Sequence, residues 1–353
     1  MDWSSLPTDL QEEVLSRVPA KSLARLRSTS KQWNTLSKFA NIHSTNAQKE
    51  SLIVMMENFR VCLVRANYLH EFDINIAPSV NVTSQFYLEH PQFKSSQVDI
   101  CNVFHCDGLL LCSTEDDKLV VFNPCSGETK WIEPRNHYKN TEFYALGYDN
   151  KSSCKNYKVL RVDRRHVRGV NNEYEIYDFT TDSWRVLGPT TDWLLPRSHR
   201  GVSVKGNTYW IACYSGGPYH EFLLSFDYST EGFQKLPLPH QSGSVVKVLS
   251  VVRENQLCLC VTISTELHVW VTAIITESVM VWRRLFKVNA SLHYDFSNGV
   301  SLLTNEQNKI MFCCNNYIYV YPDGGNVTCK LPCSHLLNYV PSLAQIQQGL
   351  RDM

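Results

Sequence analysis

A phrase made of an apolar strand, a polar turn and an aromatic residue recurs through most of this chain. Clear copies occupy residues 119–131, 174–184 and 223–233, and weaker copies end at Trp282 and, without the aromatic residue, near Cys329. The aromatic residues that end the first four copies are spaced 53, 49 and 49 residues apart. A nearly constant period of this length is typical of proteins built from repeated supersecondary units. The chain is therefore expected to fold mainly as a series of similar units.

A second strand-like run precedes each copy. These runs are residues 109–112, 158–162, 208–212, 257–261 and 309–313. Short strands separated by polar turns and repeated every ~45–50 residues indicate the four-stranded blades of a β-propeller. Five clear units cover residues 97–134, 141–188, 199–238, 246–288 and 297–332, and residues 51–75 form a degenerate sixth that the C-terminal tail could close. We therefore predict an all-β propeller-like domain of six blades over residues 50–345; an irregular β-sandwich is the alternative that the repeat disfavours.

The first 45 residues carry a different pattern, with apolar side chains at helical spacing. Pro7 suits the first turn of a helix and Pro19 cannot continue one, so a helix is expected between them. Its apolar stripe consists of Leu6, Leu10, Val14, Leu15 and Val18. Two more short helices are expected to begin near Ser22 and near Ser28 or Ser30. Three short helices are too small to bury this stripe among themselves, so it either packs on the rest of the chain as a cap or binds a partner.

These N-terminal residues resemble the F-box of plant F-box proteins. The matching run is Leu6-Pro7, Asp9-Leu10, Glu13-Val14-Leu15, Arg17-Val18-Pro19, Lys21-Ser22-Leu23, Arg25, Ser30-Lys31 and Trp33, with Val14 and Val18 standing where Ile and Leu are commoner. The resemblance implies that residues 1–45 dock a Skp-type adaptor, which joins the chain to a cullin scaffold in a ubiquitin ligase. The residues it assigns to the adaptor contact are Leu6, Pro7, Leu10, Val14, Leu15, Pro19, Leu23 and Trp33. Docking would bury the apolar stripe in a groove of the partner.

The repeated segment resembles the plant F-box-associated interaction domain (type 1). The phrases that carry this likeness include NPCSGETKWI, YEIYDFTTDSWRVL and LLSFDYSTEGFQKLPLP. The resemblance covers about residues 95–340 and implies a module that recognises target proteins. Together the two resemblances imply the substrate-recognition subunit of an SCF-type cullin-RING ubiquitin ligase, which is not itself an enzyme. A propeller that serves as a non-ligase interaction module or as a glycan reader is the alternative.

The connections expected on one face of the propeller differ from those on the other. Those between the second and third strands of a blade, and those between blades, are longer and richer in Arg, Tyr and Trp, the residue types that dominate protein interfaces. The residues predicted to bind a target are Arg135, His137, Tyr138, Arg164, Arg165, Trp193, Arg197, Tyr214, Tyr219 and His220. An arginine-rich rim could also read a phosphorylated or acidic segment. A glycan reader would instead expose Trp193, Tyr214 and Tyr219 along one depression.

The sequence carries no catalytic motif of the hydrolase, nucleotide-binding or zinc-protease kinds. Residues 115–117, a run of three carboxylates, are expected to form a solvated turn between two strands. The thirteen cysteines include no C-x-x-C pair, and the nearest clusters of metal-ligand types are Cys101, His105, Cys106 and Cys112, and Cys329, Cys333 and His335. We therefore expect no catalytic residue, no metal site and no cofactor. A propeller hydrolase would need convergent carboxylates or a metal in the central channel.

The charge balance bears on the choice of partners. Lys plus Arg and Asp plus Glu number 34 each, so the formal net charge is zero and no overall field attracts nucleic acid or an anionic membrane. The acidic start lacks the basic and apolar regions of a secretory signal, and no apolar run approaches the ~18 residues of a membrane span. We therefore expect a protein of the cytoplasm, the nucleus or both. Its partners would be the adaptor and a target protein, with neither nucleic acid nor membrane.

Overall fold

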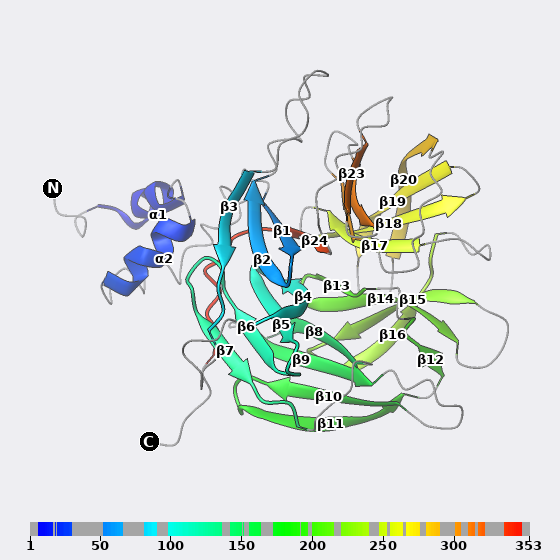
Figure 1. Ribbon diagram of the computed structural model, residues 1–353, viewed down its shortest axis with the longest axis horizontal. Coiled ribbons are helices and arrows are strands. Elements are labelled where there is room, and N and C mark those ends of the chain that lie inside the picture. The colour runs from blue at the N-terminus through cyan, green and yellow to red at the C-terminus, as the bar shows by residue number, and fades with distance from the viewer. Residues whose placement is uncertain are drawn as a thin grey trace.

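In the residues that it describes, the computed structural model shows two helices followed by many short strands (Figure 1). The helices are α1 (Thr8–Ser16) and α2 (Ala20–Thr29). The structure describes residues 6–16, 18, 20–29, 52–65, 81–89, 98–135, 142–149, 151, 155–163, 172–190, 192–196, 200–214, 220–239, 247–252, 255–263, 266–275, 280–289, 301–304, 310–314, 317–321 and 335–347. The third helix, expected around Trp33, lies outside these residues.

The described strands form six antiparallel sheets. The first contains β1 (Leu52–Glu57), β2 (Arg60–Arg65), β3 (Asn81–Phe86) and the late strand β24 (His335–Tyr339). The second contains β4 (Ile100–Cys106), β5 (Leu109–Thr114), β6 (Leu119–Phe122) and β7 (Thr129–Ile132), and the third contains β8 (Glu142–Asp149), β9 (Asn156–Asp163), β10 (Asn172–Asp178) and β11 (Ser183–Thr190). The fourth contains β12 (Trp193–Leu194), β13 (Val202–Val204), β14 (Asn207–Tyr214), β15 (Glu221–Asp227) and β16 (Gly232–Leu236). The fifth contains β17 (Lys247–Val252), β18 (Gln256–Ile263), β19 (Glu266–Ile275) and β20 (Met280–Asn289), and the sixth contains β21 (Ser301–Thr304), β22 (Ile310–Cys314) and β23 (Tyr317–Tyr321).

The six sheets are arranged as the blades of a propeller, which confirms the predicted fold and excludes the β-sandwich. The inner strands β24, β4, β8, β13, β17 and β21 neighbour one another in that order, and β21 returns to β24. The ring is closed by β24, which pairs with β1 from Leu52 opposite Tyr339 to Met56 opposite His335. This pairing confirms the expected closure by the C-terminal tail. It also removes the free edge that β1 would otherwise present to another chain.

The core lies between neighbouring blades rather than inside any one of them. Along β5, Leu109 and Leu111 join a cluster shared with the next blade, whereas Leu110 and Cys112 join a cluster shared with the blade before it. Successive side chains of a strand point to opposite sides of the sheet, so a blade covered on both sides needs an unbroken apolar run. This is why the middle strands read as continuous apolar sequence instead of alternating with polar residues.

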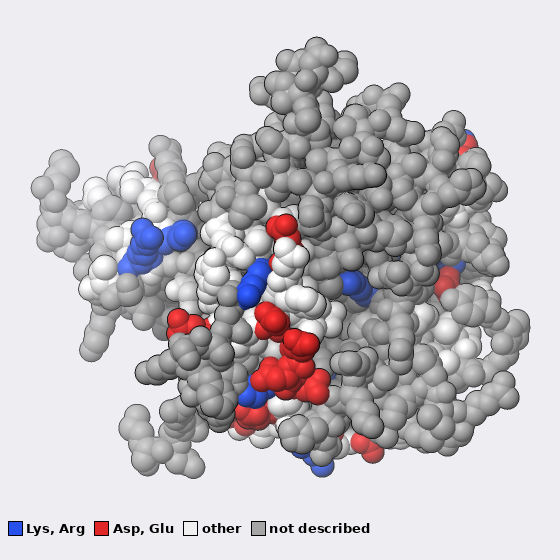
Figure 2. Space-filling model, in the orientation of Figure 1, with Lys and Arg blue, Asp and Glu red and all other residues white. Residues whose placement is uncertain are grey.

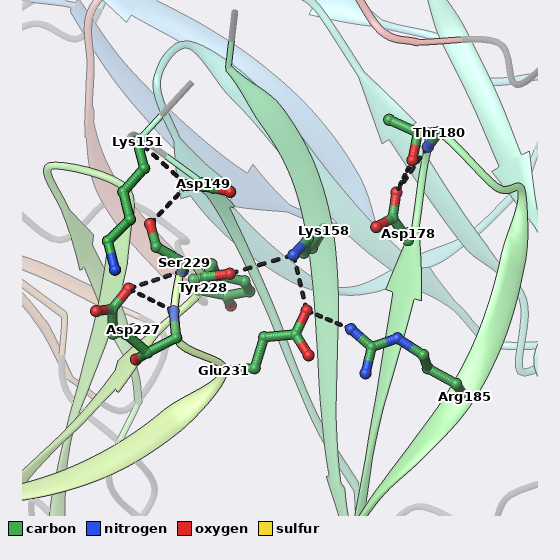
Figure 3. Close-up of polar contacts among 11 residues, drawn as sticks. Asp149, Lys151, Lys158, Asp178, Thr180, Arg185, Asp227, Tyr228, Ser229 and Glu231 are labelled. Carbon is green, nitrogen blue, oxygen red and sulfur yellow. Dashed lines mark hydrogen bonds and ion pairs between the residues drawn. The ribbon is translucent and has the colours of Figure 1, made fainter. Parts of the chain in front are cut away.

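The recurring turn phrase has a local chemical cause, visible in Figure 3 for two of its copies. The turn after the third strand begins at Asn123, Asp178 or Asp227, and this side chain accepts a hydrogen bond from the backbone N–H two residues further on, at 2.8, 2.8 and 2.7 Å. Such Asx turns are favoured because the short side chain replaces a backbone acceptor. The fifth residue of each turn has a positive φ, at Gly127 (77°), Asp182 (53°) and Glu231 (55°). The repeat detected in the sequence is therefore a repeat of turn geometry.

Candidate functional site

The helical unit is an amphipathic pair whose two apolar sides have different fates. Leu10 and Val14 of α1 are 46% and 47% exposed, whereas Leu15 of α1 and Leu23 of α2 are each 3% exposed. The spacing of four residues places Leu10 and Val14 on one side of the helix, and Leu15 lies on another. Of the other residues predicted to contact an adaptor, Leu6 is half-buried and Pro7 is exposed; Pro19 and Trp33 lie outside the described residues.

The buried side of the helical unit packs on the propeller. Leu15 and Leu23 form a cluster with Leu343, and Cys125 in the turn between β6 and β7 is partly buried against it, as are Val18, Ala24 and Leu26. Figure 1 shows the helices on the side of the first two blades, with the C-terminal segment running from β24 toward them. One part of the apolar stripe therefore caps the propeller, as the first alternative predicts, and another part remains exposed.

Residues 340–347, which we call the tail, follow β24 and lie along the turns of the second and third blades. The amide of Asn123 donates to the carbonyl oxygens of Ser342 (3.1 Å) and Ala344 (2.8 Å). Lys130 Nζ donates to the carbonyl of Gln347 at 3.2 Å. Gly108 makes room for the tail, because a Cβ at that position would lie 2.3 Å from the Cβ of Ser342. We call this side of the propeller the tail face; it carries the connections between first and second and between third and fourth strands.

The opposite side, which we call the loop face, carries the connections between second and third strands and between blades. Strands of an antiparallel blade alternate in direction, so these connections must emerge at the other end. Arg135, Tyr214 and His220, three of the predicted target-binding residues, lie at strand ends on this face. The helices and the tail contact turns of the tail face. The predicted adaptor contacts and the predicted target contacts therefore lie toward opposite faces.

Arg135 takes part in a charge network at the edge of the loop face. Its Nη1 atom lies 3.1 Å from Oε1 of Glu175, and Nη1 of Arg161 lies 3.1 Å from Oε2 of the same carboxylate. The side chains of Glu175 and Arg161 are 1% and 3% exposed, whereas that of Arg135 is 49% exposed. A buried carboxylate needs such partners, because removing it from water is costly. Arg135 thus presents part of a guanidinium to solvent while its carboxylate partner holds it in place.

Tyr214, one of the predicted target-binding residues, is 41% exposed. Its ring stacks with His220 at 6.1 Å between centroids, and Lys235 Nζ lies 4.6 Å from the ring centroid. Trp193 differs: it is 6% exposed and packs against Phe233, with 4.7 Å between ring centroids, in the cluster between the third and fourth blades. Trp193 therefore supplies no exposed platform for a sugar. The other predicted residues, His137, Tyr138, Arg164, Arg165, Arg197 and Tyr219, lie outside the described residues.

The loop face also carries an acidic group outside the set of predicted target-binding residues. Asp99, Glu115, Asp116 and Asp117 surround Cys101, and burial together with these carboxylates raises the pKa of its thiol. Figure 2 shows Asp and Glu side chains gathered over β4 and β5, and Lys and Arg side chains on the helical unit. Residues 115–117 form the exposed turn between β5 and β6, as expected from the sequence. Their neighbour Asp99 precedes another strand, and only the pairing of β4 with β5 brings it beside them.

The cysteine and histidine clusters form no metal site in the part of the chain that the structure describes, where no group of three or more His, Cys, Asp or Glu could hold an ion. His105 instead accepts a hydrogen bond from the Gly108 N–H at Nε2 (3.1 Å), and burial lowers its pKa to about 4. Cys106 and Cys112 are buried cysteines, and the Cys106 Sγ accepts a hydrogen bond from Ser203 Oγ at 3.1 Å. Cys329 and Cys333 lie outside the described residues, and His335 lies in β24. Neither described helix is long and apolar enough to cross a membrane.

Comparison with known proteins agrees with this two-part arrangement. A family model described as the F-box domain matches residues 3–45, and one described as the F-box associated beta propeller domain matches residues 52–346. An F-box protein of Arabidopsis thaliana is 51% identical over 373 residues, covering 98% of this chain and 100% of the relative. A second is 43% identical over 368 residues, with coverages of 97% and 98%. An F-box/kelch-repeat protein of the same organism is 39% identical over 376 residues, with coverages of 99% and 98%.

Proposed function

Because the chain belongs to the family of F-box proteins that carry an F-box associated β-propeller domain, we propose that it is the substrate-recognition subunit of an SCF-type cullin-RING ubiquitin ligase. In this role the helical unit binds a Skp-type adaptor, and the propeller holds a target protein. The chain itself supplies no catalytic group. Its contribution is to raise the effective concentration of the target near enzymes recruited elsewhere on the cullin scaffold.

The observation that carries this proposal is the exposed apolar side of α1. Leu10 and Val14 are 46% and 47% exposed, whereas Leu15 and Leu23 of the same helical unit are buried. Two such side chains one turn apart are the usual anchors of a helix that lies in a partner's groove. Burying the exposed half of each would contribute roughly 1 kcal/mol per side chain. The tail covers neither of them, since its apolar contact is with Leu15 and Leu23.

The loop face supports target binding for a steric reason. The helices and the tail occupy turns of the tail face, so a large partner on α1 leaves the loop face accessible. Exposed Tyr214, His220 and Arg135 lie there, and tyrosine and arginine are enriched among the residues that dominate binding energy. We propose that the target binds on this face.

A binding assay with a purified Skp-type adaptor tests the proposal. The double variant Leu10→Asp plus Val14→Asp places two charges in the proposed contact and should abolish adaptor binding. A matched control is Val186→Asp plus Val281→Asp, because these valines are exposed by 45% and 42% on the outer strands β11 and β20. The control should bind the adaptor like wild type. If the Leu10 and Val14 variant binds the adaptor as well as the control does, or if wild type does not bind it, the proposal fails. The propeller would then be an interaction module outside a ligase.

A further inference from the structure

The tail is anchored along its length to the turns of the tail face. The side-chain amide of Asn123 donates hydrogen bonds to the tail, to the carbonyl oxygens of Ser342 (3.1 Å) and Ala344 (2.8 Å). Ile346 donates its backbone N–H to Oε2 of Glu128 at 3.4 Å, and its side chain is 3% exposed in the cluster between the second and third blades. Because Asn123 is itself fully buried, these bonds are shielded from water. The tail is therefore part of the propeller rather than a loose end.

Leu343 lies between these anchor points and packs against the helices and Cys125. It is 6% exposed, and the cluster that buries it contains Leu15 and Leu23. The residues on either side are held by Asn123, so the backbone at Leu343 has a defined position. A side chain whose backbone is fixed on both sides is a rigid contact point for whatever packs on it. Here the helical unit packs on it.

We propose that the tail is a clamp: through Leu343 it holds the helical unit on the tail face and so fixes the orientation of the exposed side of α1 relative to the loop face. This inference deepens the proposed function, in which the adaptor binds that side of α1 and the target binds the loop face. Transfer to a bound target depends on its orientation as well as its proximity, and a fixed orientation favours it. In this arrangement Leu15 and Leu23 make contacts within the chain, and Leu10 and Val14 stay exposed for the adaptor.

The competing explanation is that the tail covers part of the adaptor site and must leave before the adaptor binds. The two explanations differ in what happens when Leu343 is shortened. A clamp predicts looser helices with unchanged adaptor affinity. A competitor predicts tighter adaptor binding, because the partner no longer has to displace the tail.

Amide hydrogen exchange on the full chain tests the clamp. In Leu343→Ala, peptides from α1 and α2 should exchange about tenfold faster than in wild type, while β5 and β15 remain protected. Gln345→Ala is the matched control, because Gln345 lies two residues along the same segment and is exposed. It should exchange like wild type. Unchanged exchange of the helices in Leu343→Ala would overturn the proposal.

A second variant covers the case in which Leu343→Ala also loosens the propeller. Leu15→Ala removes the same contact from the helix side, and it should accelerate exchange in α2 while β5 and β15 stay protected. The double variant should then exchange no faster than the more affected single variant, since both remove one contact. Independent, additive effects of the two substitutions would show that the two leucines do not act as a pair and would also overturn the clamp.

Adaptor affinity separates the clamp from the competitor. Leu343→Ala should bind a purified Skp-type adaptor within about threefold of wild type. Binding that is tighter by about tenfold would show that the tail competes, and binding weaker by about tenfold would show that Leu343 belongs to the adaptor contact. Either result overturns the clamp. If wild type does not bind the adaptor, the proposed ligase function fails, while the exchange experiment still decides whether the tail holds the helices.

Discussion

Leu15 of α1 and Leu343 of the tail lie in one buried cluster, although they come from opposite ends of the chain. Their side chains are 3% and 6% exposed, whereas Leu10 and Val14 of the same helix are 46% and 47% exposed. The contact therefore divides the apolar surface of the helical unit into a part that packs on the propeller and a part that remains accessible to a partner. It also places that accessible part at a defined position beside the second blade.

Because Tyr228 packs directly against Gly147, any side chain at position 147 should destabilise the propeller. A Cβ on Gly147 would lie 2.0 Å from the Tyr228 ring and 2.4 Å from the carbonyl oxygen of Gly206. Because Tyr228 is fully buried between blades, it has no room to move away. We expect Gly147→Ala to lower the free energy of unfolding by about 2 kcal/mol or more. Urea unfolding measures this, and Gly232→Ala is the control, since its nearest neighbour would be 3.6 Å away. Similar losses in both variants would contradict the explanation.

Glu175 should contribute to stability through the two arginines it accepts from. Glu175→Gln keeps the shape of the side chain but removes the negative charge beside the buried guanidinium of Arg161, which should cost about 3 kcal/mol in the free energy of unfolding. Arg135 is 49% exposed, so Arg135→Gln should cost less than about 1 kcal/mol. The same urea series measures both. Equal effects would show that the difference in burial does not govern this network.

His105 should make the propeller sensitive to acid. Burial lowers its pKa from 6.5 to about 4, against an opposing influence of Asp107. Between these values the unfolded chain binds a proton that the folded chain does not, so stability should fall as the pH drops through this window, by roughly 2–3 kcal/mol in total. His105→Gln retains an acceptor for the Gly108 N–H but cannot titrate. The free energy of unfolding should therefore fall less between pH 7 and about pH 4 in this variant than in wild type. Identical losses would assign the acid sensitivity to other groups.

The exposed aromatic group of the loop face should matter for target capture. Tyr214→Ser plus His220→Ser removes the stacked pair without touching the helical unit. Proximity labelling with the proteasome blocked should then lose proteins that the wild-type chain labels, while the adaptor is still labelled. Val186→Ser plus Val281→Ser, on outer strands, should label like wild type. An unchanged set of labelled proteins in the Tyr214 and His220 variant would show that the target binds elsewhere.

The propeller could be predicted because its strongest signals are local. Asn123, Asp178 and Asp227 each bond the backbone of their own turn, so the same short phrase reappears wherever the turn does. The incomplete first unit could likewise be matched with the C-terminal end, since a blade with an unpaired inner edge needs a strand from elsewhere. The predicted target-binding residues could be placed on one face by the alternation of strand direction. Their exposure could not, as Trp193 and Tyr214 show: they are directly paired on β12 and β14, yet one is 6% and the other 41% exposed.

The sequence by itself determined the kind of each part: a helical unit with more apolar surface than it can bury, and repeated strands that close into a ring. Only the tertiary structure decided which part of the helical surface is available. Helical spacing separates Leu10 and Val14 from Leu15, but no local pattern tells which of these two sides becomes buried. The two sides differ because Leu343 packs against Leu15 and not against Leu10. The closing strand β24 and the hydrogen bonds from Asn123 hold Leu343 in that place. Burial depends on which distant segments meet after folding, and that information is absent from any short stretch of the chain.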